Sequence, residues 1–241
     1  MNKPGVVSDH NLAILKNIPT QSIIDSLWVK GWPMTFIENA RPLQPGQKMA
    51  GRAVTLRFIP HRPDIAADKP KGELSAEYVA FELCGPGEVL VIDAMGWPFS
   101  SVGGDIKFLR LMQRKVGGLV TDGAVRDSKA LKKYGFPVYS ANLTAKQGPG
   151  EFWPWQVNDA IQCGRVLVRP GDAIVGDDDG VVVVPSSIVD EVIEISYQRE
   201  EVEGIVKAQL EIELCSPGKY YPFNDKTWQL YEDKTGKNRP T

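Results

Sequence analysis

The middle of the chain alternates short aliphatic runs with amphipathic segments, and few folds accommodate that pattern. Val89–Asp93, Leu119–Thr121 and Phe136–Ser140 are predicted to be strands. Asp105–Val116 is predicted to be an amphipathic helix that stops at a glycine pair, and Asp127–Tyr134 a second, shorter helix. The alternation of strands and helices predicts an α/β fold.

Both flanks of this region are predicted to be rich in strands and to contain helices near the chain ends. Three Pro-Gly pairs precede apolar, β-branched residues, which indicates turns that lead into strands. Thr20 is expected to cap a helix that ends near Gly31, and a long helix is expected from about Ser187 to Glu213. Asp177–Gly180 is interpreted as a hairpin turn, because it lacks the alternation and closing glutamate of a calcium-binding EF-hand loop.

The chain is expected to form a single domain, because no Pro/Ser-rich linker divides its 241 residues. We assign residues 19–213 to this domain and residues 1–18 to an N-terminal arm. Pro60–Glu73 is interpreted as a surface loop. Residues 214–241 form a C-terminal extension that is too aromatic for plain disorder, so we expect it to pack on the body or on a neighbouring subunit.

The composition excludes several classes of function. The chain carries 28 Lys and Arg against 30 Asp and Glu, a net charge of −2, whereas a nucleic-acid-binding protein needs a basic surplus. Its two histidines, His10 and His61, lie far apart, which excludes a His-rich zinc site and argues against a histidine general base. Enzymatic chemistry would therefore depend on carboxylates, arginines, lysines and backbone amides.

The sequence predicts a cytoplasmic protein that does not contact a membrane. Its three cysteines are widely spaced and form no CxxC motif, which is typical of reduced thiols. The N-terminus lacks the apolar core of a signal peptide. The longest apolar runs, such as Val181–Val184, suit buried strands and are too short to span a bilayer.

Residues that could carry chemistry gather in two segments, Gly103-Gly104-Asp105 and, twenty residues further, Arg126-Asp127. The glycines precede a helix whose first N–H groups are unsatisfied, so an anion could approach the backbone there. Arg126 and Asp127 follow a strand, and ligands of α/β sheets bind beyond the carboxyl ends of strands. We therefore predict that both segments meet in one cleft. The alternative is that these residues have structural roles only: the glycines form a tight turn, Asp105 caps the helix, and Arg126 and Asp127 form a solvated ion pair.

The segment Gly117–Asp127, with the sequence GGLVTDGAVRD, resembles the signature of the RraA-like family, which includes the 4-hydroxy-4-methyl-2-oxoglutarate/4-carboxy-4-hydroxy-2-oxoadipate aldolases. The spacing between Asp105 and Arg126-Asp127 is also similar to that family's pattern, as is Val168–Pro185. The resemblance covers about residues 20–210. It implies a layered β/α sandwich of the swivelling β/α type. It also implies a homotrimer, or a hexamer of two trimers, with sites between subunits.

The resemblance further implies a divalent metal, Mg²⁺ or Mn²⁺, and a role for each residue of the two segments. Asp127 matches the metal-binding carboxylate, and Arg126 matches the arginine that holds the pyruvate part of the substrate. Asp105 matches a carboxylate that orders metal-bound water. The amides around Gly103 and Gly104 match the cradle for the substrate carboxylate.

A glutamate in the last helix of a neighbouring subunit is also implied to approach the metal through water. Glu203 is the best match for it, and Glu200 and Glu201 are close alternatives. The substrate partner implied by the resemblance is a small α-keto acid.

The activity implied by the resemblance is that of a class II, metal-dependent lyase, an aldolase or decarboxylase. It would cleave a C–C bond of a pyruvate-derived 4-hydroxy-2-oxo dicarboxylate or of oxaloacetate through a metal-stabilised pyruvate enolate. Two alternatives stay open: a non-catalytic regulator of ribonuclease E, as some family members are, and another enolate reaction on the same site.

Three segments depart from the family pattern and leave the substrate open. They are the long Phe58–Ala76 region, the aromatic stretch at residues 147–155 and the C-terminal tail. Within the first, His61 and Arg62 either bind a second carboxylate or belong to a plain surface loop; we favour the loop.

Overall fold

Eight strands form one mixed sheet that curls into a nearly closed barrel, which confirms the prediction of a single α/β domain. The computed structural model describes residues 6–239. Across the sheet the strands are β1 (Arg41–Pro42), β5 (Val138–Leu143), β4 (Gly118–Val125), β3 (Glu88–Asp93), β2 (Met49–Pro60), β9 (Ala173–Gly176) and β10 (Val181–Val184), with β6 (Phe152–Val157) paired to β2. The central strands β2 to β5 are parallel, and the other pairs are antiparallel.

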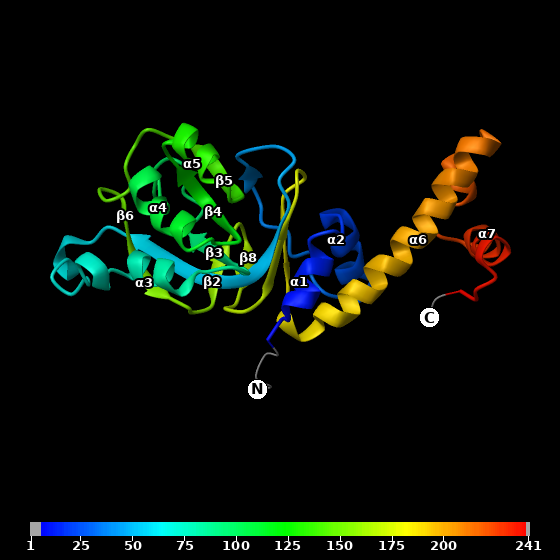
Figure 1. The fold of residues 1–241 in the computed structure, drawn as a ribbon, viewed down its shortest axis with the longest axis horizontal. Coiled ribbons are helices and arrows are strands. Elements are labelled where there is room, and N and C mark those ends of the chain that lie inside the picture. The colour runs from blue at the N-terminus through cyan, green and yellow to red at the C-terminus, as the bar shows by residue number, and fades with distance from the viewer. Residues whose placement is uncertain (1–5, 240–241) are drawn as a thin grey trace.

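Helices cover one face of the central strands, and a separate two-stranded sheet covers the other (Figure 1). The covering elements are α3 (Ala76–Leu83), α4 (Asp105–Gln113) and α5 (Ser128–Tyr134) on the first face, and β7 (Ile161–Cys163) and β8 (Val166–Val168) on the second. Leu90 and Ile92 of β3 pack beneath the helices, whereas Val89 and Val91 pack on the opposite face. The four residues between Glu88 and Asp93 are all apolar because both faces of the strand are covered.

A second group of helices packs against β9 and β10. It comprises α1 (Asp9–Leu15), α2 (Thr20–Val29) and the start of α6 (Val189–Glu213). The helix α2 begins at the expected residue, but its N-cap is Pro19, so the capping role predicted for Thr20 is wrong. The amide and hydroxyl of Thr20 donate instead to the carboxylate of Asp177, at 2.9 and 2.8 Å. Asp177 lies in the predicted turn between β9 and β10, so a distant residue satisfies the helix terminus.

Some local structure differs from the sequence expectation. Residues 1–18 do not form an arm throughout, because Ser8 caps α1 and the helix buries Leu12 and Leu15; residues 1–5 lie outside the described part. The sequence predicted neither α3 nor β6. Pro60–Glu73 is largely exposed and holds short 3₁₀ turns, as a surface loop does. Within the described residues, the 3₁₀ turns are Pro63–Ile65, Gly72–Leu74, Ser186–Ile188 and Pro217–Lys219.

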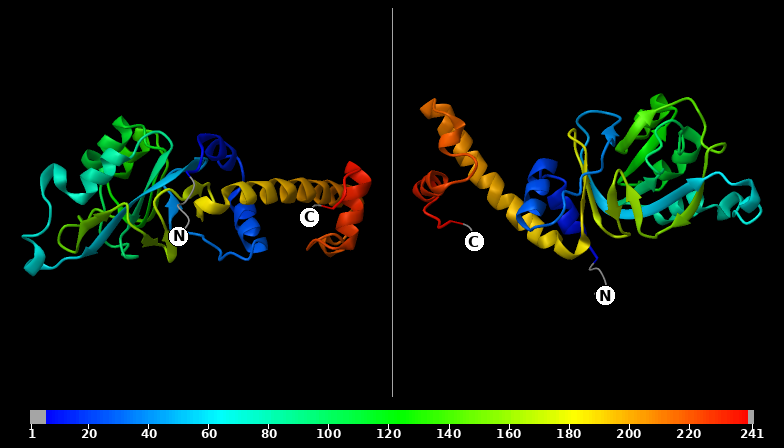
Figure 2. Two further views of the ribbon diagram at one scale, coloured as in Figure 1. Left: turned by 90° about the horizontal axis from the view of Figure 1, so that it is seen from below. Right: turned by 180° about the vertical axis from the view of Figure 1, so that it is seen from behind.

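The far half of α6 leaves the body and forms an arm with α7 (Asp225–Thr235), as Figure 2 shows from two further sides. Near the body, Ser196 of α6 shares a buried hydrogen bond of 2.8 Å with Ser26 of α2. Farther out, α6 and α7 enclose a small core of their own, built around Val202, Val206 and Tyr231. The C-terminal extension therefore packs on α6 within one chain. No helix in residues 6–239 combines the length and apolar character that a membrane crossing requires.

The end of this arm is predicted to respond to acid through Glu213. Hydrogen bonds from Lys219, Tyr220 and Gln209 lower the pKa of Glu213 to about 2 from its ordinary 4.5. A carboxyl group whose pKa is lower in the folded state stabilises that state above pH 4.5, and the contribution is lost as the pH falls towards 2. We therefore expect the protection factors of the α7 amides, which compare their hydrogen exchange with the intrinsic rate at each pH, to fall across that interval, and to fall less in Glu213→Gln. An identical response in the variant would contradict this assignment. The pKa of Glu201 is lowered by Lys237, so part of the response should remain.

Candidate functional site

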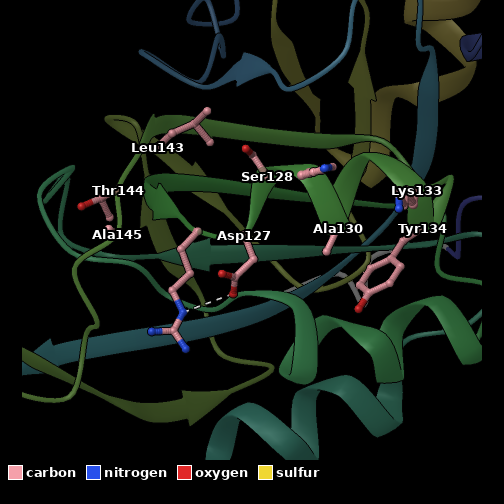
Figure 3. Close-up of a pocket in the computed structure, with 10 residues that line it drawn as sticks. Asp127, Ser128, Ala130, Lys133, Tyr134, Leu143, Thr144 and Ala145 are labelled. Carbon is pink, nitrogen blue, oxygen red and sulfur yellow. Dashed lines mark ion pairs between the residues drawn. The ribbon is translucent and has the colours of Figure 1, made fainter.

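The two segments singled out in the sequence meet at the carboxyl end of β4. The backbone amide of Asp105 donates to Oδ2 of Asp127 at 3.1 Å, and Nε of Arg126 lies 3.3 Å from the same oxygen (Figure 3). The amide of Arg126 donates to the carbonyl of Gly103 at 3.1 Å. The side chains of Arg126 and Asp127 are 41% and 37% exposed, so an ion or small molecule can reach both.

Backbone geometry at this junction requires specific residues. A Cβ atom on Gly104 would lie 2.1 Å from Oδ2 of Asp127 and 2.7 Å from Cγ of Arg126, so any other residue there would displace these two side chains. Asp127 itself has a φ of 56°, in the left-handed region that non-glycine residues rarely adopt. Aspartate tolerates this conformation better than most residues, because its short polar side chain bonds locally.

The start of α4 presents backbone amides to the cleft. Within residues 6–239, the amides of Gly103 and Gly104 have no hydrogen-bond acceptor. Asp105 also satisfies one amide at the start of the helix, since its Oδ1 accepts a hydrogen bond from the amide of Ile106 at 2.7 Å. Its second carboxylate oxygen is left for another partner. The helix terminus therefore keeps free donors for an anion.

Two cavities adjoin Arg126. The smaller, about 150 Å³, is lined by Ser101, Gly103, Gly104, Asp105, Ile106, Lys107, Arg126, Gln147, Gly148 and Pro149. The larger, about 790 Å³, is lined by Arg126, Asp127, Ser128, Lys129, Ala130, Lys133, Tyr134, Leu143, Thr144 and Ala145. In Figure 3, Asp127 lies between Leu143 to Ala145 on one side and Lys133 and Tyr134 on the other. Arg126 thus borders both a small cavity beside Gly103 and Gly104 and a wide one beside α5.

Tyr134 also belongs to this site, although no pattern in the sequence indicated it. Its hydroxyl donates to the carbonyl of Asp105 at 3.0 Å and so ties the end of α5 to the start of α4. Partial burial raises the pKa of Tyr134, and the charges of Asp105 and Asp127 raise it further, which keeps the phenol neutral. No local pattern distinguishes Tyr134 from an ordinary residue at the end of a helix.

Asp122, within the same motif, proves to be a structural carboxylate. It is 3% exposed and accepts hydrogen bonds from the amides of Ala94 at 2.7 Å, Gly96 at 3.0 Å and Gly164 at 3.1 Å. The amide of Gln162 donates to it as well, at 3.0 Å. Because its lone pairs are occupied, Asp122 holds the loops around β4 in place.

Within one chain the glutamates of α6 do not join the cleft. Glu203 belongs to α6, whose far half projects away from α4 and α5 (Figure 1), and it lies 3.6 Å from Arg199. Partial burial raises the pKa of Glu203. Glu200 bonds to Ser22, and Glu201 to Tyr231. A role for any of them at the cleft therefore requires a second copy of the chain and stays a prediction.

The residues present fit a hydrated divalent metal rather than a closed protein cage. In the described part of the chain, no three His, Cys, Asp or Glu side chains are grouped closely enough to hold a metal ion. Mg²⁺ keeps several waters and is commonly held by one or two carboxylates together with the substrate. Asp127, which is partly exposed beside the larger cavity, suits that role.

His61 and Arg62 do not take part in the cleft. The ring of His61 packs on Trp153, with centroids 4.4 Å apart, and Arg62 forms an ion pair with Asp64. Neither residue lines one of the two cavities. The structure therefore supports the interpretation of this segment as a surface loop. A second carboxylate of a substrate would have to bind to other residues.

The residues of the cleft lie within the part of the chain that matches a known protein family. The sequence profile of the RraA-like family, described as Aldolase/RraA, matches residues 20–183. A protein of Halalkalibacterium halodurans named "Putative 4-hydroxy-4-methyl-2-oxoglutarate aldolase" is 32% identical over 189 residues, or 77% of this chain and 81% of that protein.

Solved structures show the same fold. Streptomyces coelicolor RraAS2, described as an unusual member of the RNase ES inhibitor RraA protein family, is 30% identical with a TM-score of 0.75, over 84% of this chain and 98% of that one. An uncharacterized protein from Pseudomonas syringae pv. tomato reaches a TM-score of 0.79 at 20% identity, over 91% of this chain and 96% of that one. The overall fold thus recurs in other proteins.

Proposed function

The chain belongs to the RraA-like family, and on this premise we propose that it is a divalent-metal-dependent lyase. The proposed substrates are a pyruvate-derived 4-hydroxy-2-oxo dicarboxylate or oxaloacetate. The observation that carries the proposal is the meeting of the Asp127 carboxylate, the Arg126 guanidinium and free backbone amides in one cleft. Similarity to a relative named as an aldolase supports the same class of reaction.

In the proposed reaction, the amides of Gly103 and Gly104 bind the carboxylate next to the keto group. The C4 hydroxyl loses its proton and becomes a carbonyl as the C3–C4 bond breaks. The electron pair passes to C3 and the keto oxygen, and C3 then takes up a proton to give pyruvate. Arg126 stabilises the charge that develops on the keto oxygen. Asp105, with one carboxylate oxygen free, holds the proton in transit through water.

A divalent cation, Mg²⁺ or Mn²⁺, held at Asp127 would supply Lewis-acid stabilisation of the same charge. Oxaloacetate would react in the same way, with CO₂ as the leaving group, because it also leaves the pyruvate enolate. No Schiff-base lysine is needed in this scheme, and no histidine.

Removal of the metal provides the direct test. We expect pyruvate release from oxaloacetate and from 4-hydroxy-4-methyl-2-oxoglutarate to stop in EDTA and to return when Mg²⁺ or Mn²⁺ is added in excess. A reaction with metal but no protein corrects for spontaneous decarboxylation. Release that persists in EDTA, or that never exceeds the protein-free rate, would contradict the proposal.

A regulatory function is the second candidate, favoured by the similarity to RraAS2. In that case the chain would bind a ribonuclease of the RNase E type and lower its activity, whether or not the metal is present. Inhibition of such a ribonuclease without any pyruvate release from the substrates above would favour this alternative. Another enolate reaction on the same residues is tested by exchange of the C3 protons of pyruvate with solvent.

We also propose that the chain assembles as a homotrimer or as a hexamer. The projecting arm supports this proposal, since Glu203 lies on it and could reach a cleft only in a second copy. Light scattering after size exclusion distinguishes three, six and single copies.

A further inference from the structure

We infer that Lys129 and Lys133 form a subsite for the distal carboxylate of the substrate, an inference that rests on the proposed function. The proposed dicarboxylates carry two carboxylates, and the amides beside Arg126 account for only one. His61 and Arg62, which the sequence offered for the other, lie outside both cavities. The distal group therefore needs a cationic partner on a different part of the cleft wall.

The larger cavity has the size and the charge for this role. Its volume of about 790 Å³ exceeds what a three-carbon keto acid needs and falls within the range of small-molecule sites. Three cationic side chains line it, those of Arg126, Lys129 and Lys133, against the single carboxylate of Asp127. Its wall thus carries a surplus of positive charge on the side of Asp127 that faces α5.

The two lysines differ from other lysines near the cleft because they lack acidic partners. Lys107 is paired with Glu77 at 2.6 Å, and Lys146 is paired with Glu151. Within residues 6–239, neither Lys129 nor Lys133 forms an ion pair. Both remain available to a ligand.

The helix places these two lysines side by side. They are four residues apart on α5, so they share one face, and both are exposed. Like charges at this spacing destabilise a helix, which a bound anion would relieve. Lys132 lies between them in the sequence but does not line the cavity, and it therefore serves as a matched control.

Binding of two five-carbon probes tests the subsite without any turnover. 2-Oxoglutarate carries the distal carboxylate, and 2-oxopentanoate has a methyl group in its place. We expect calorimetry in the presence of Mg²⁺ to show that the protein binds 2-oxoglutarate about tenfold or more tightly, as a charge-assisted contact should give. Lys129→Met/Lys133→Met should remove this preference, whereas Lys132→Met and Lys129→Arg/Lys133→Arg should keep it.

The outcomes separate this inference from the proposed function. If the preference is lost in the methionine variant but no pyruvate is ever released, the subsite stands and the lyase proposal fails. If pyruvate release depends on metal but the methionine variant keeps the preference, the lyase stands and the subsite is wrong. The absence of any preference in the unaltered protein also overturns the subsite. Circular dichroism of each variant verifies that it is folded.

Discussion

Replacing Asp127 by alanine is expected to lower metal-dependent pyruvate release by about 1,000-fold or more, because several kcal/mol of charge stabilisation depend on the cation held there. Asp127 is the one carboxylate that lines the larger cavity in the described part of the chain. Its Oδ2 also accepts the hydrogen bond from the amide of Asp105 and faces Arg126. The substitution therefore removes the proposed metal ligand and loosens the start of α4.

The amide variant Asp127→Asn separates these two effects. It keeps an acceptor for the Asp105 amide but carries no charge, so it should retain the melting temperature of the unaltered protein and still lose the metal. Titration with Mn²⁺, followed by its paramagnetic effect on water relaxation, measures that loss directly. Full activity in either variant would show that the site lies elsewhere.

Replacing Gly104 by alanine is expected to reduce kcat/KM by about 100-fold or more while leaving the fold intact, since displacements near 1 Å cost that much in a catalytic site. The new methyl carbon would lie 2.1 Å from the Asp127 carboxylate and 2.7 Å from the Arg126 side chain. Both groups must therefore move. The substitution therefore displaces both the proposed metal ligand and the proposed substrate-binding arginine.

Gly150→Ala is the matched control for this variant. Gly150 is also in a loop, but nothing lies within 4 Å of a Cβ atom added there. Assays of the two variants should show a loss in Gly104→Ala alone. Equal activities would mean that Asp127 and Arg126 do not need their present positions.

The sequence predicted the central part of the fold because short-range patterns determine it. The amphipathic helix from Asp105 and the strands on both sides of it follow from apolar spacing alone. Convergence of Asp105 with Arg126 and Asp127 follows from topology, since a helix and a strand return the chain to the same edge of the sheet.

Tertiary contacts determine the features that the sequence did not predict. The start of α2 is satisfied by Asp177, which is 157 residues away, so no local capping signal exists. Tyr134 enters the cleft only because α4 and α5 pack side by side. The absence of ion pairs at Lys129 and Lys133 in the described part of the chain likewise depends on where carboxylates from other segments lie. No local sequence pattern predicts those positions.

The small core between α6 and α7 shares no residue with the cores that hold the sheet. Changes at well-separated positions without common partners add almost independently in their effect on stability. Substitutions within this small core are therefore expected to change the stability of the arm while leaving the stability of the sheet nearly unaltered. If Glu203 reaches the cleft of a second copy, such a substitution would weaken the reaction in a neighbouring chain while the fold around Asp127 stays intact.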